Sequence, residues 1–269
     1  MSPRIEDYIT IDEEGYDKEE EDHYDYLLEW FEKNPGVYYY RQLEVLHEDR
    51  KFHWITRRVL DRLVEDGVLR RLVRTRTRGL VVSFVYTTQL TKTYVNQRIS
   101  QLIKIINEYS ESNLQHDVGD WAEFLVKNMF EKYGWRVVAR HANEFRGVQW
   151  PKSKENIDFI FKKNDIVIGV EVKDTLGYIK STELRSKTEM CVYLGVLPCF
   201  VLRKAPRMYQ NLVNYYEGFI SYFLTKFYPY HYSDFVHRIY EQTMLPVNAW
   251  WEIPEKVQGI IKRWFDTLK

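Results

Sequence analysis

The chain has 269 residues, of which 45% are hydrophobic, and its 39 basic and 39 acidic side chains give a formal net charge of zero at pH 7. This apolar content can fill the core of one large or two small domains, and no uncharged run is long enough for a membrane span or a signal peptide. The 2 cysteines, Cys191 and Cys199, lie among apolar residues, which favours buried thiols in a reducing compartment over a disulfide or a metal site. We therefore expect an intracellular protein without a membrane segment.

The neutral total hides a separation of charge along the chain. Residues 1–32 are strongly acidic, and residues 50–78 are rich in arginine. A basic segment of this kind favours a nucleic-acid partner even when the whole chain is neutral. We predict that residues 1–21 form an acidic, flexible and solvated tail. The alternative is that this segment shields the basic surface when DNA is absent.

Residues 22–89 show the order of elements of a winged helix-turn-helix. In chain order, helices, a short extended segment and strands are predicted over residues 22–33, 37–39, 41–47, 53–66, 68–74 and 80–87. In this layout the third helix enters the major groove, and the turn between the last two strands contacts the DNA backbone or the minor groove. We therefore predict DNA contacts from Arg57, Arg58, Arg62, Arg74, Arg76 and Arg78. Winged helices also dock proteins, so a protein partner is the alternative for this domain.

Residues 90–113 are predicted to form a connecting helix, and the pattern breaks at 113–117. Residues 114–224 then alternate helices with strands, which predicts a mixed central sheet flanked by helices. The elements are predicted over residues 117–133, 135–140, 156–161, 166–173, 182–194, 196–202, 208–216 and 218–223. A long polar loop is expected over residues 141–155, where Trp150 either packs or stacks on a base.

Two acidic residues of this region are predicted to face each other across a β-hairpin. If residues 164 and 165 form the tight turn, counting outward places Asp158 opposite Glu171. Lys173 leaves the same face as Glu171, because side chains alternate along a strand. Like charges directly across a strand pair destabilise it, so a cation held between the two carboxylates is the simplest explanation of the pattern.

Asp158, Glu171 and Lys173, in this order and spacing, resemble the motif of the PD-(D/E)XK nuclease superfamily, which includes restriction endonucleases and archaeal Holliday junction resolvases. The resemblance covers residues 117–223, and Ile157 takes the place of the proline in the family name. It implies a restriction-endonuclease-like core. Together with residues 22–89, the expected fold is α/β, with a mixed central sheet flanked by helices and a separate N-terminal winged-helix domain.

The same resemblance implies a set of catalytic residues and a divalent metal. Family members carry a glutamate on the helix before the sheet, and Glu123 stands at that place. Mg²⁺, with Mn²⁺ as a substitute, would be held by Asp158, Glu171, Glu123 and the backbone carbonyl of Val172. Lys173 would orient the attacking water or stabilise developing charge. Related nucleases place a polar or basic residue on the helix after the hairpin, and we expect Lys187 in that role.

The last part of the chain, residues 225–269, is dense in aromatic side chains. We predict a helical extension that packs on the sheet or against a second subunit. A double-strand cut made with one site per chain would favour a symmetric homodimer. A protein partner would bind through the winged helix or through this aromatic segment.

These features predict a metal-dependent DNA endonuclease, a hydrolase that is cytoplasmic and associated with the nucleoid. We expect a structure-specific, resolvase-like or repair-like enzyme, because the core resembles the archaeal resolvases. A restriction-type enzyme that cuts at a fixed sequence is the first alternative, because resolvases of this fold are usually shorter and lack a winged helix. The second alternative is a non-catalytic DNA-binding regulator with a nuclease fold as scaffold, although a scaffold has no need of paired carboxylates.

Overall fold

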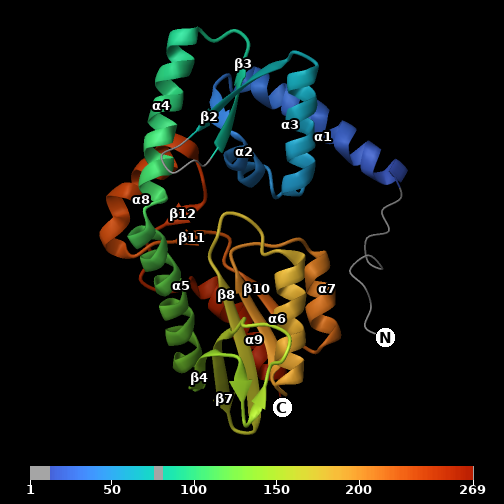
Figure 1. The fold of residues 1–269 in the computed structure, drawn as a ribbon, viewed down its shortest axis with the longest axis vertical. Helices are drawn as coiled ribbons and strands as arrows, with labels where there is room; N and C mark the ends of the chain where they lie inside the picture. Colours follow the sequence, from blue (N-terminus) through green and yellow to red (C-terminus); the bar gives the residue numbers. More distant parts are fainter. Residues whose placement is uncertain (1–12, 76–80, 269) are drawn as a thin grey trace. The chain divides into compact units, whose positions relative to one another are not determined.

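A computed structural model describes residues 13–75 and 81–268 of the chain (Figure 1). The described residues form a mixed α/β protein. The described residues divide into two compact units: the amino-terminal unit contains residues 13–75, 81–115 and His237–Leu245, and the carboxy-terminal unit contains His116–Val236 and residues 246–268. Among the described residues, no helix combines the length and the apolar character that a membrane span requires.

The amino-terminal unit consists of helices and a small antiparallel sheet. Its elements are α1 (Glu13–Lys33), β1 (Val37–Tyr39), α2 (Tyr40–Leu46), α3 (His53–Glu65), β2 (Leu69–Thr75), β3 (Val81–Thr87) and α4 (Lys92–Tyr109). The strands pair in the order β1-β3-β2. Apolar side chains at helical spacing, Leu27 and Phe31 of α1 and Ile55 and Leu63 of α3, share one buried cluster. The second and third predicted helices and the strands of the hairpin are therefore confirmed, with ends shifted by one residue at most.

Helix α1 is longer than the sequence pattern predicts. The acidic pattern predicts a tail through residue 21, but α1 begins at Glu13, so the prediction is wrong for residues 13–21. The physical reason is that carboxylates of this segment have basic partners, which relieves their mutual repulsion. The ion pairs are Glu19–Lys51 at 3.3 Å, Glu20–Arg58 at 2.9 Å and Glu21–Arg62 at 2.5 Å. The rest of the predicted tail, residues 1–12, lies outside the described part of the chain.

The break after the connecting helix also lies at a different place. Helix α4 ends at Tyr109, and α5 (Ser112–Lys132) begins five residues before the predicted start at 117. Leu114, Val118 and Ala122 are all buried and lie four residues apart, so one apolar stripe runs through the segment that the sequence pattern assigns to a break.

The carboxy-terminal unit is built on a five-stranded mixed sheet with the strand order β10-β9-β8-β7-β4 (Figure 1). Pairs β4–β7 and β7–β8 are antiparallel, and pairs β8–β9 and β9–β10 are parallel. The elements after α5 are β4 (Arg136–Ala142), β5 (Glu144–Phe145), β6 (Val148–Gln149), β7 (Ile157–Lys163), β8 (Ile166–Lys173), α6 (Ser181–Tyr193), β9 (Leu197–Leu202), α7 (Met208–Tyr215), β10 (Phe219–Tyr222), β11 (Lys226–Phe227), the 3-10 helix η2 (Tyr230–Tyr232), α8 (Ser233–Thr243), β12 (Val247–Asn248) and α9 (Glu255–Thr267). Residues 237–243 of α8 belong to the amino-terminal unit.

Helices cover both faces of this sheet. On one face, Phe130 of α5 and Phe265 of α9 share a buried cluster with Phe161 of β7. On the other face, Cys191 of α6 packs in a cluster with Ile160 of β7, while α7 packs with β9 and β10. Both cysteines are free and buried, as their apolar surroundings predict. The sheet is thus the middle layer of three, which is the arrangement predicted for a mixed sheet flanked by helices.

Two predictions for this unit need correction. The long polar loop over residues 141–155 is shorter, because β4 extends to Ala142 and the hairpin β5–β6 follows it. Trp150 in this region is only 4% exposed, which agrees with the predicted alternative that it packs. The aromatic segment is not purely helical, because β11 and β12 pair within it. Its last helix, α9, packs on the sheet of the same unit, as predicted in one of the two alternatives.

Candidate functional site

The hairpin β7–β8 has the register that the sequence predicts. Residues 164 and 165 form the turn, and Asn164 adopts a left-handed conformation with φ of 54°, which asparagine tolerates. The ladder runs from Lys163↔Ile166 to Phe159↔Val170. It ends one residue before Asp158, whose Oδ2 instead accepts a hydrogen bond from the Val172 N–H at 2.8 Å. The Asp158 side chain therefore closes the end of the hairpin, and Val172 is bound to it through its backbone.

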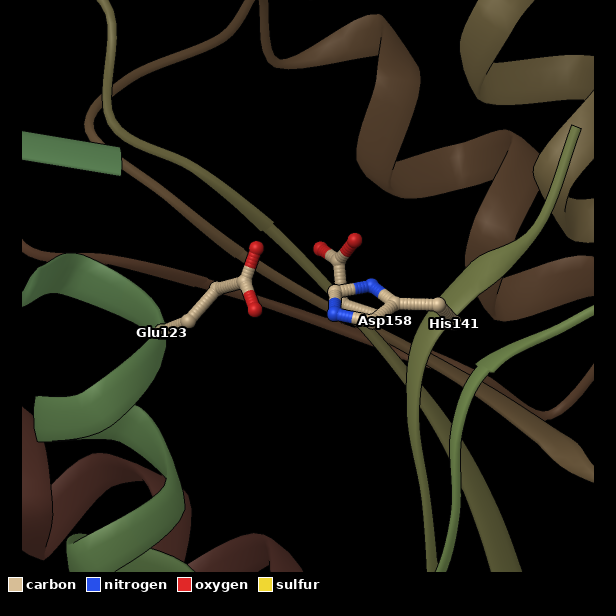
Figure 2. A group of neighbouring side chains, drawn as sticks. All are labelled: Glu123, His141 and Asp158. Atoms are coloured by element: carbon tan, nitrogen blue, oxygen red, sulfur yellow. The ribbon is translucent and has the colours of Figure 1, made fainter. Parts of the chain in front are cut away.

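Asp158 also lies beside two side chains from other elements. Strand β4 pairs with β7 so that Arg140 faces Phe159 and Ala142 faces Ile157, which puts His141 directly opposite Asp158. Helix α5 contributes Glu123, and one ligand atom from each of Glu123, His141 and Asp158 lies within 4.8 Å of the others (Figure 2). Among the described residues, these three side chains form a group whose carboxylate and imidazole atoms are close enough together to hold a metal ion.

His141 is the residue of this group that the sequence pattern missed. The pattern ends the strand at Arg140 and assigns His141 to a loop. In the structure, β4 continues beyond it and shifts register between Val137 and Ala139. The backbone of His141 is left-handed, with φ of 44°, which is uncommon for a residue in a strand. The position of His141 across from Asp158 could have indicated a role in the site. That position follows only from the register of β4, and a bulge shifts this register in a way that the sequence pattern does not show.

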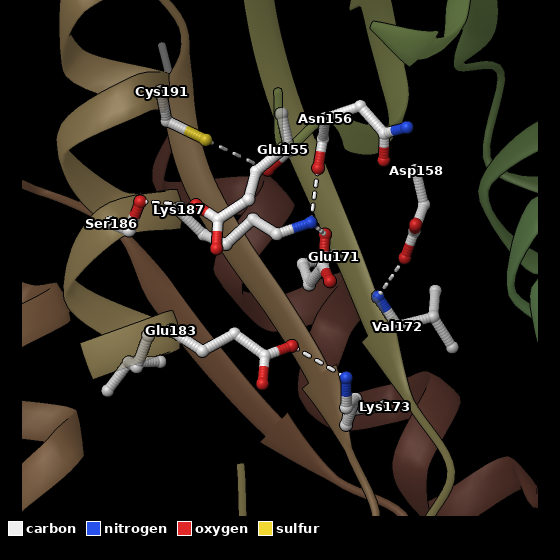
Figure 3. A network of polar contacts seen from close by, with 12 residues as sticks. Glu155, Asn156, Asp158, Glu171, Val172, Lys173, Glu183, Ser186, Lys187 and Cys191 are labelled. Carbon is white, nitrogen blue, oxygen red and sulfur yellow. Dashed lines mark hydrogen bonds and ion pairs between the residues drawn. The ribbon is translucent and has the colours of Figure 1, made fainter. Parts of the chain in front are cut away.

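Glu171 does not join this group and instead forms a buried ion pair. Its Oε2 accepts a hydrogen bond from Lys187 Nζ at 2.8 Å, and the side chains are only 6% and 8% exposed (Figure 3). Lys187 of α6 also donates to the carbonyl oxygen of Asn156. The predicted catalytic lysine therefore lies in the site, but as a buried partner of Glu171 rather than as an exposed cation.

Lys173 lies further along β8, and its Nζ donates to Glu183 Oε1 of α6 at 2.6 Å (Figure 3). Its side chain is 33% exposed, so the ammonium group can reach water and a bound ligand. The two lysines thus differ in environment: Lys187 neutralises a buried carboxylate, whereas Lys173 remains accessible at the rim of the site.

The carboxyl groups of the site are crowded, and this crowding changes their pKa values. Burial raises the pKa of Glu171, and the neighbouring Asp158 carboxylate raises it further, against the opposing effect of Lys187. Burial likewise raises the pKa of Asp158, although the hydrogen bond from Val172 acts in the other direction. For Glu123, burial and then Asp158 raise the pKa. Shared negative charge in a poorly solvated place favours binding of a cation.

The predicted DNA-binding arginines belong to the amino-terminal unit, and on α3 each has a carboxylate partner. Arg57 pairs with Glu44 at 2.6 Å, and Arg58 and Arg62 make the ion pairs with α1 given above. The three arginine side chains are 40–51% exposed, and the Arg58 and Arg62 pairs are of the weak, solvent-screened kind. The Glu44 carboxylate that binds Arg57 is only 2% exposed, so this pair is less screened. Arg74 of β2 is exposed and contacts the Asn96 side chain. Arg76 and Arg78 lie outside the described residues.

Comparison with protein-family models, with curated protein sequences and with solved structures gave no match to this chain. The chemistry of the site therefore rests on its own residues. These are two carboxylates and an imidazole in one group, and next to it a carboxylate–ammonium pair.

Proposed function

We propose that this chain is a metal-dependent DNA endonuclease of the PD-(D/E)XK type. The observation that carries the proposal is the group of Glu123, His141 and Asp158, from α5, β4 and β7. The Glu171–Lys187 pair and Lys173 lie next to this group. The order of elements around the hairpin supports a restriction-endonuclease-like core, since α5 precedes the sheet and α6 follows the hairpin. Paired acids beside a lysine are suited to the hydrolysis of a phosphodiester.

The donor atoms of the site suit a divalent cation. Glu123 and Asp158 offer carboxylate oxygens to a metal. The family pattern would add Glu171 and the carbonyl of Val172, but in this structure Lys187 binds the Glu171 carboxylate. When bound, Mg²⁺ or Mn²⁺ would polarise the scissile phosphate and lower the pKa of a water molecule. The α6 lysine, Lys187, holds the Glu171 carboxylate in place.

Lys173 has the environment of a group that acts on substrate. Its ammonium is partly exposed and is oriented by Glu183. A compact positive charge at this position would stabilise negative charge on the phosphate and orient the attacking water. Glu183 would thereby position Lys173 without touching the substrate.

The amino-terminal unit supports a role in DNA recognition. Three helices followed by an antiparallel pair of strands, with β1 completing the sheet, match the layout of a winged helix. Helix α3 would then face the major groove, and Arg74 would contact the backbone from the strand pair. A protein partner is the alternative for this unit. A symmetric dimer that makes double-strand cuts is a further part of the proposal.

Cleavage of supercoiled plasmid and of a four-way junction tests this function, with Mg²⁺, with Mn²⁺ and with EDTA. We expect metal-dependent cutting that Asp158→Ala and Glu171→Ala abolish while DNA binding persists. Glu252→Ala is the matched control, because the Glu252 side chain is 72% exposed. Absence of cutting by the folded wild type under every metal condition would contradict the proposal and favour a DNA-binding regulator.

The same digests distinguish the two kinds of enzyme. Cutting at a fixed position relative to the branch point, in junctions of unrelated sequence, would support the structure-specific enzyme that we propose. Cutting at one sequence in linear duplex would support a restriction-type enzyme instead.

A further inference from the structure

We infer that His141 is a nitrogen ligand of the metal site and that this site consequently binds Mn²⁺, as a representative transition-metal ion, in preference to Mg²⁺. The inference rests on the metal site of the proposed function and names the ion which that site selects. Neither the sequence motif nor the family pattern includes this histidine.

Three side chains from three elements meet at the site. His141 reaches the site from β4, Asp158 from β7 and Glu123 from α5, so the three donors approach from three different elements (Figure 2). Their ligand atoms lie within 4.8 Å of one another. Donors on opposite sides of an ion with bonds of about 2.1 Å are about 4.2 Å apart, so small rotations of these side chains are sufficient for binding.

Glu171 belongs to a competing set of metal ligands. An oxygen-only site would use Asp158, Glu171 and the carbonyl of Val172. In the structure, the Glu171 carboxylate is bound by the ammonium of Lys187, and both side chains are more than nine-tenths buried (Figure 3). The Glu171 carboxylate is thus already neutralised by an internal cation. The carboxylates that remain for a metal are those of Asp158 and Glu123, and these are the two that lie beside His141.

The types of donor atom determine which metal ion the site prefers. Mg²⁺ is a hard ion that strongly prefers oxygen ligands, whereas imidazole suits Mn²⁺ less well than zinc or iron but better than it suits Mg²⁺. Two carboxylates and one imidazole leave coordination positions open for water and for a phosphate oxygen. A site of this composition therefore discriminates between the two ions through His141.

The backbone at His141 agrees with this role. A residue with a Cβ in a strand rarely has a left-handed conformation, and the φ of 44° turns the chain at this position. The ring is exposed, so the conformation is not imposed by burial of the side chain. Its effect is to hold the imidazole on the side of Asp158 and Glu123.

The test measures binding of Mn²⁺ to the full-length protein without DNA, by electron paramagnetic resonance, with Mg²⁺ as competitor. We expect the wild type to bind Mn²⁺ at least about tenfold more tightly than Mg²⁺, and His141→Ala to lose most of this preference. Pulsed measurements on bound Mn²⁺ should show coupling to an imidazole nitrogen in the wild type and none in His141→Ala. His231→Ala is the control, since His231 is an exposed histidine of the same unit that lies outside the site.

A second variant distinguishes loss of the nitrogen ligand from a change in the backbone conformation at residue 141. Asparagine tolerates the left-handed conformation and offers an oxygen donor, so His141→Asn should keep Mg²⁺ affinity and lose the nitrogen coupling. Lack of nitrogen coupling in the wild type would overturn the inference, as would equal losses of Mn²⁺ and Mg²⁺ affinity in His141→Ala. Nitrogen coupling without DNA cleavage would uphold the inference and contradict the proposed function. Cleavage with Mg²⁺ but without nitrogen coupling would support the proposed function and overturn the inference about His141.

Discussion

Lys187 donates a hydrogen bond to Glu171 at 2.8 Å, and neither side chain has more than 8% of its surface exposed. Burial of two charges is costly, and it is compensated only while both partners are present. Burial alone would lower the pKa of Lys187, but the Glu171 carboxylate raises it, so the lysine remains charged. The pair therefore fixes the orientation of the Glu171 carboxylate near the end of β8, close to Asp158.

Removal of the lysine alone should destabilise the protein strongly. Lys187→Met leaves Glu171 buried without its counter-charge, and we expect the free energy of unfolding to fall by about 3 kcal/mol or more at pH 9, above the raised pKa of Glu171. The double variant Lys187→Met with Glu171→Leu should recover much of this loss. Lys173→Met is the matched control, because the Lys173–Glu183 pair is partly exposed and should contribute about 1 kcal/mol or less. Urea unfolding measures all of these, and equal losses for the two lysines would contradict the interpretation.

The raised pKa of Glu171 predicts how stability depends on pH. A carboxyl group whose pKa is higher in the folded state binds its proton more tightly there, so its contribution is present at low pH and is lost as the pH rises. For Glu171 the loss should occur between the ordinary value of 4.5 and about 8. Unfolding curves across this range in EDTA should show stability that falls with pH in the wild type and falls less in Glu171→Gln. Parallel curves for the two proteins would show that Glu171 does not titrate in this range.

Two glycines near the site should respond oppositely to alanine. A Cβ on Gly169 of β8 would come within 2.7 Å of Cys191 Sγ and 2.9 Å of Val196 Cγ2, so Gly169→Ala should cost about 1–3 kcal/mol. A Cβ on Gly119 of α5 meets open space, and Gly119→Ala should stabilise the helix by up to about 1 kcal/mol. Thermal unfolding of both variants checks the signs. Similar stability changes for the two would contradict the close packing of α6 on β8.

The hairpin could be predicted from sequence because local rules determine it. A two-residue turn and alternation of side chains fix the register of β7 and β8, and Asp158 and Glu171 follow from counting. The same rules do not predict that Asp158 points to Glu123 and His141 while Glu171 points to Lys187. That division depends on which helix lies beside each side chain.

The remaining differences come from tertiary contacts that the local pattern does not contain. Residues Glu19 to Glu21 read as a repulsive acidic run, and only their partners on and before α3 explain why they are helical. His141 lies beyond a register shift in β4, so counting from the predicted end of the strand does not reach it. Lys187 has the sequence context of a surface lysine, and its burial follows from the packing of α6 on the sheet.

The pairs between α1 and α3 predict how the amino-terminal unit binds DNA. If Arg58 and Arg62 contact phosphates, the carboxylates of Glu20 and Glu21 compete with DNA for them. Glu20→Gln with Glu21→Gln should then raise the affinity for duplex DNA and make the slope of log affinity against log salt steeper by about 1 to 2. Glu29→Gln is the control, because Glu29 pairs with Lys33 within α1 at 3.6 Å.

Fluorescence anisotropy of a labelled duplex at several salt concentrations gives both the affinity and the slope. A double variant with unchanged affinity and slope would show that the arginines of α3 do not contact DNA. Such a result would favour a protein as the partner of the amino-terminal unit. It would leave the site on β7 and β8 to be tested separately by cleavage, because the two kinds of variant lie in different units of the chain.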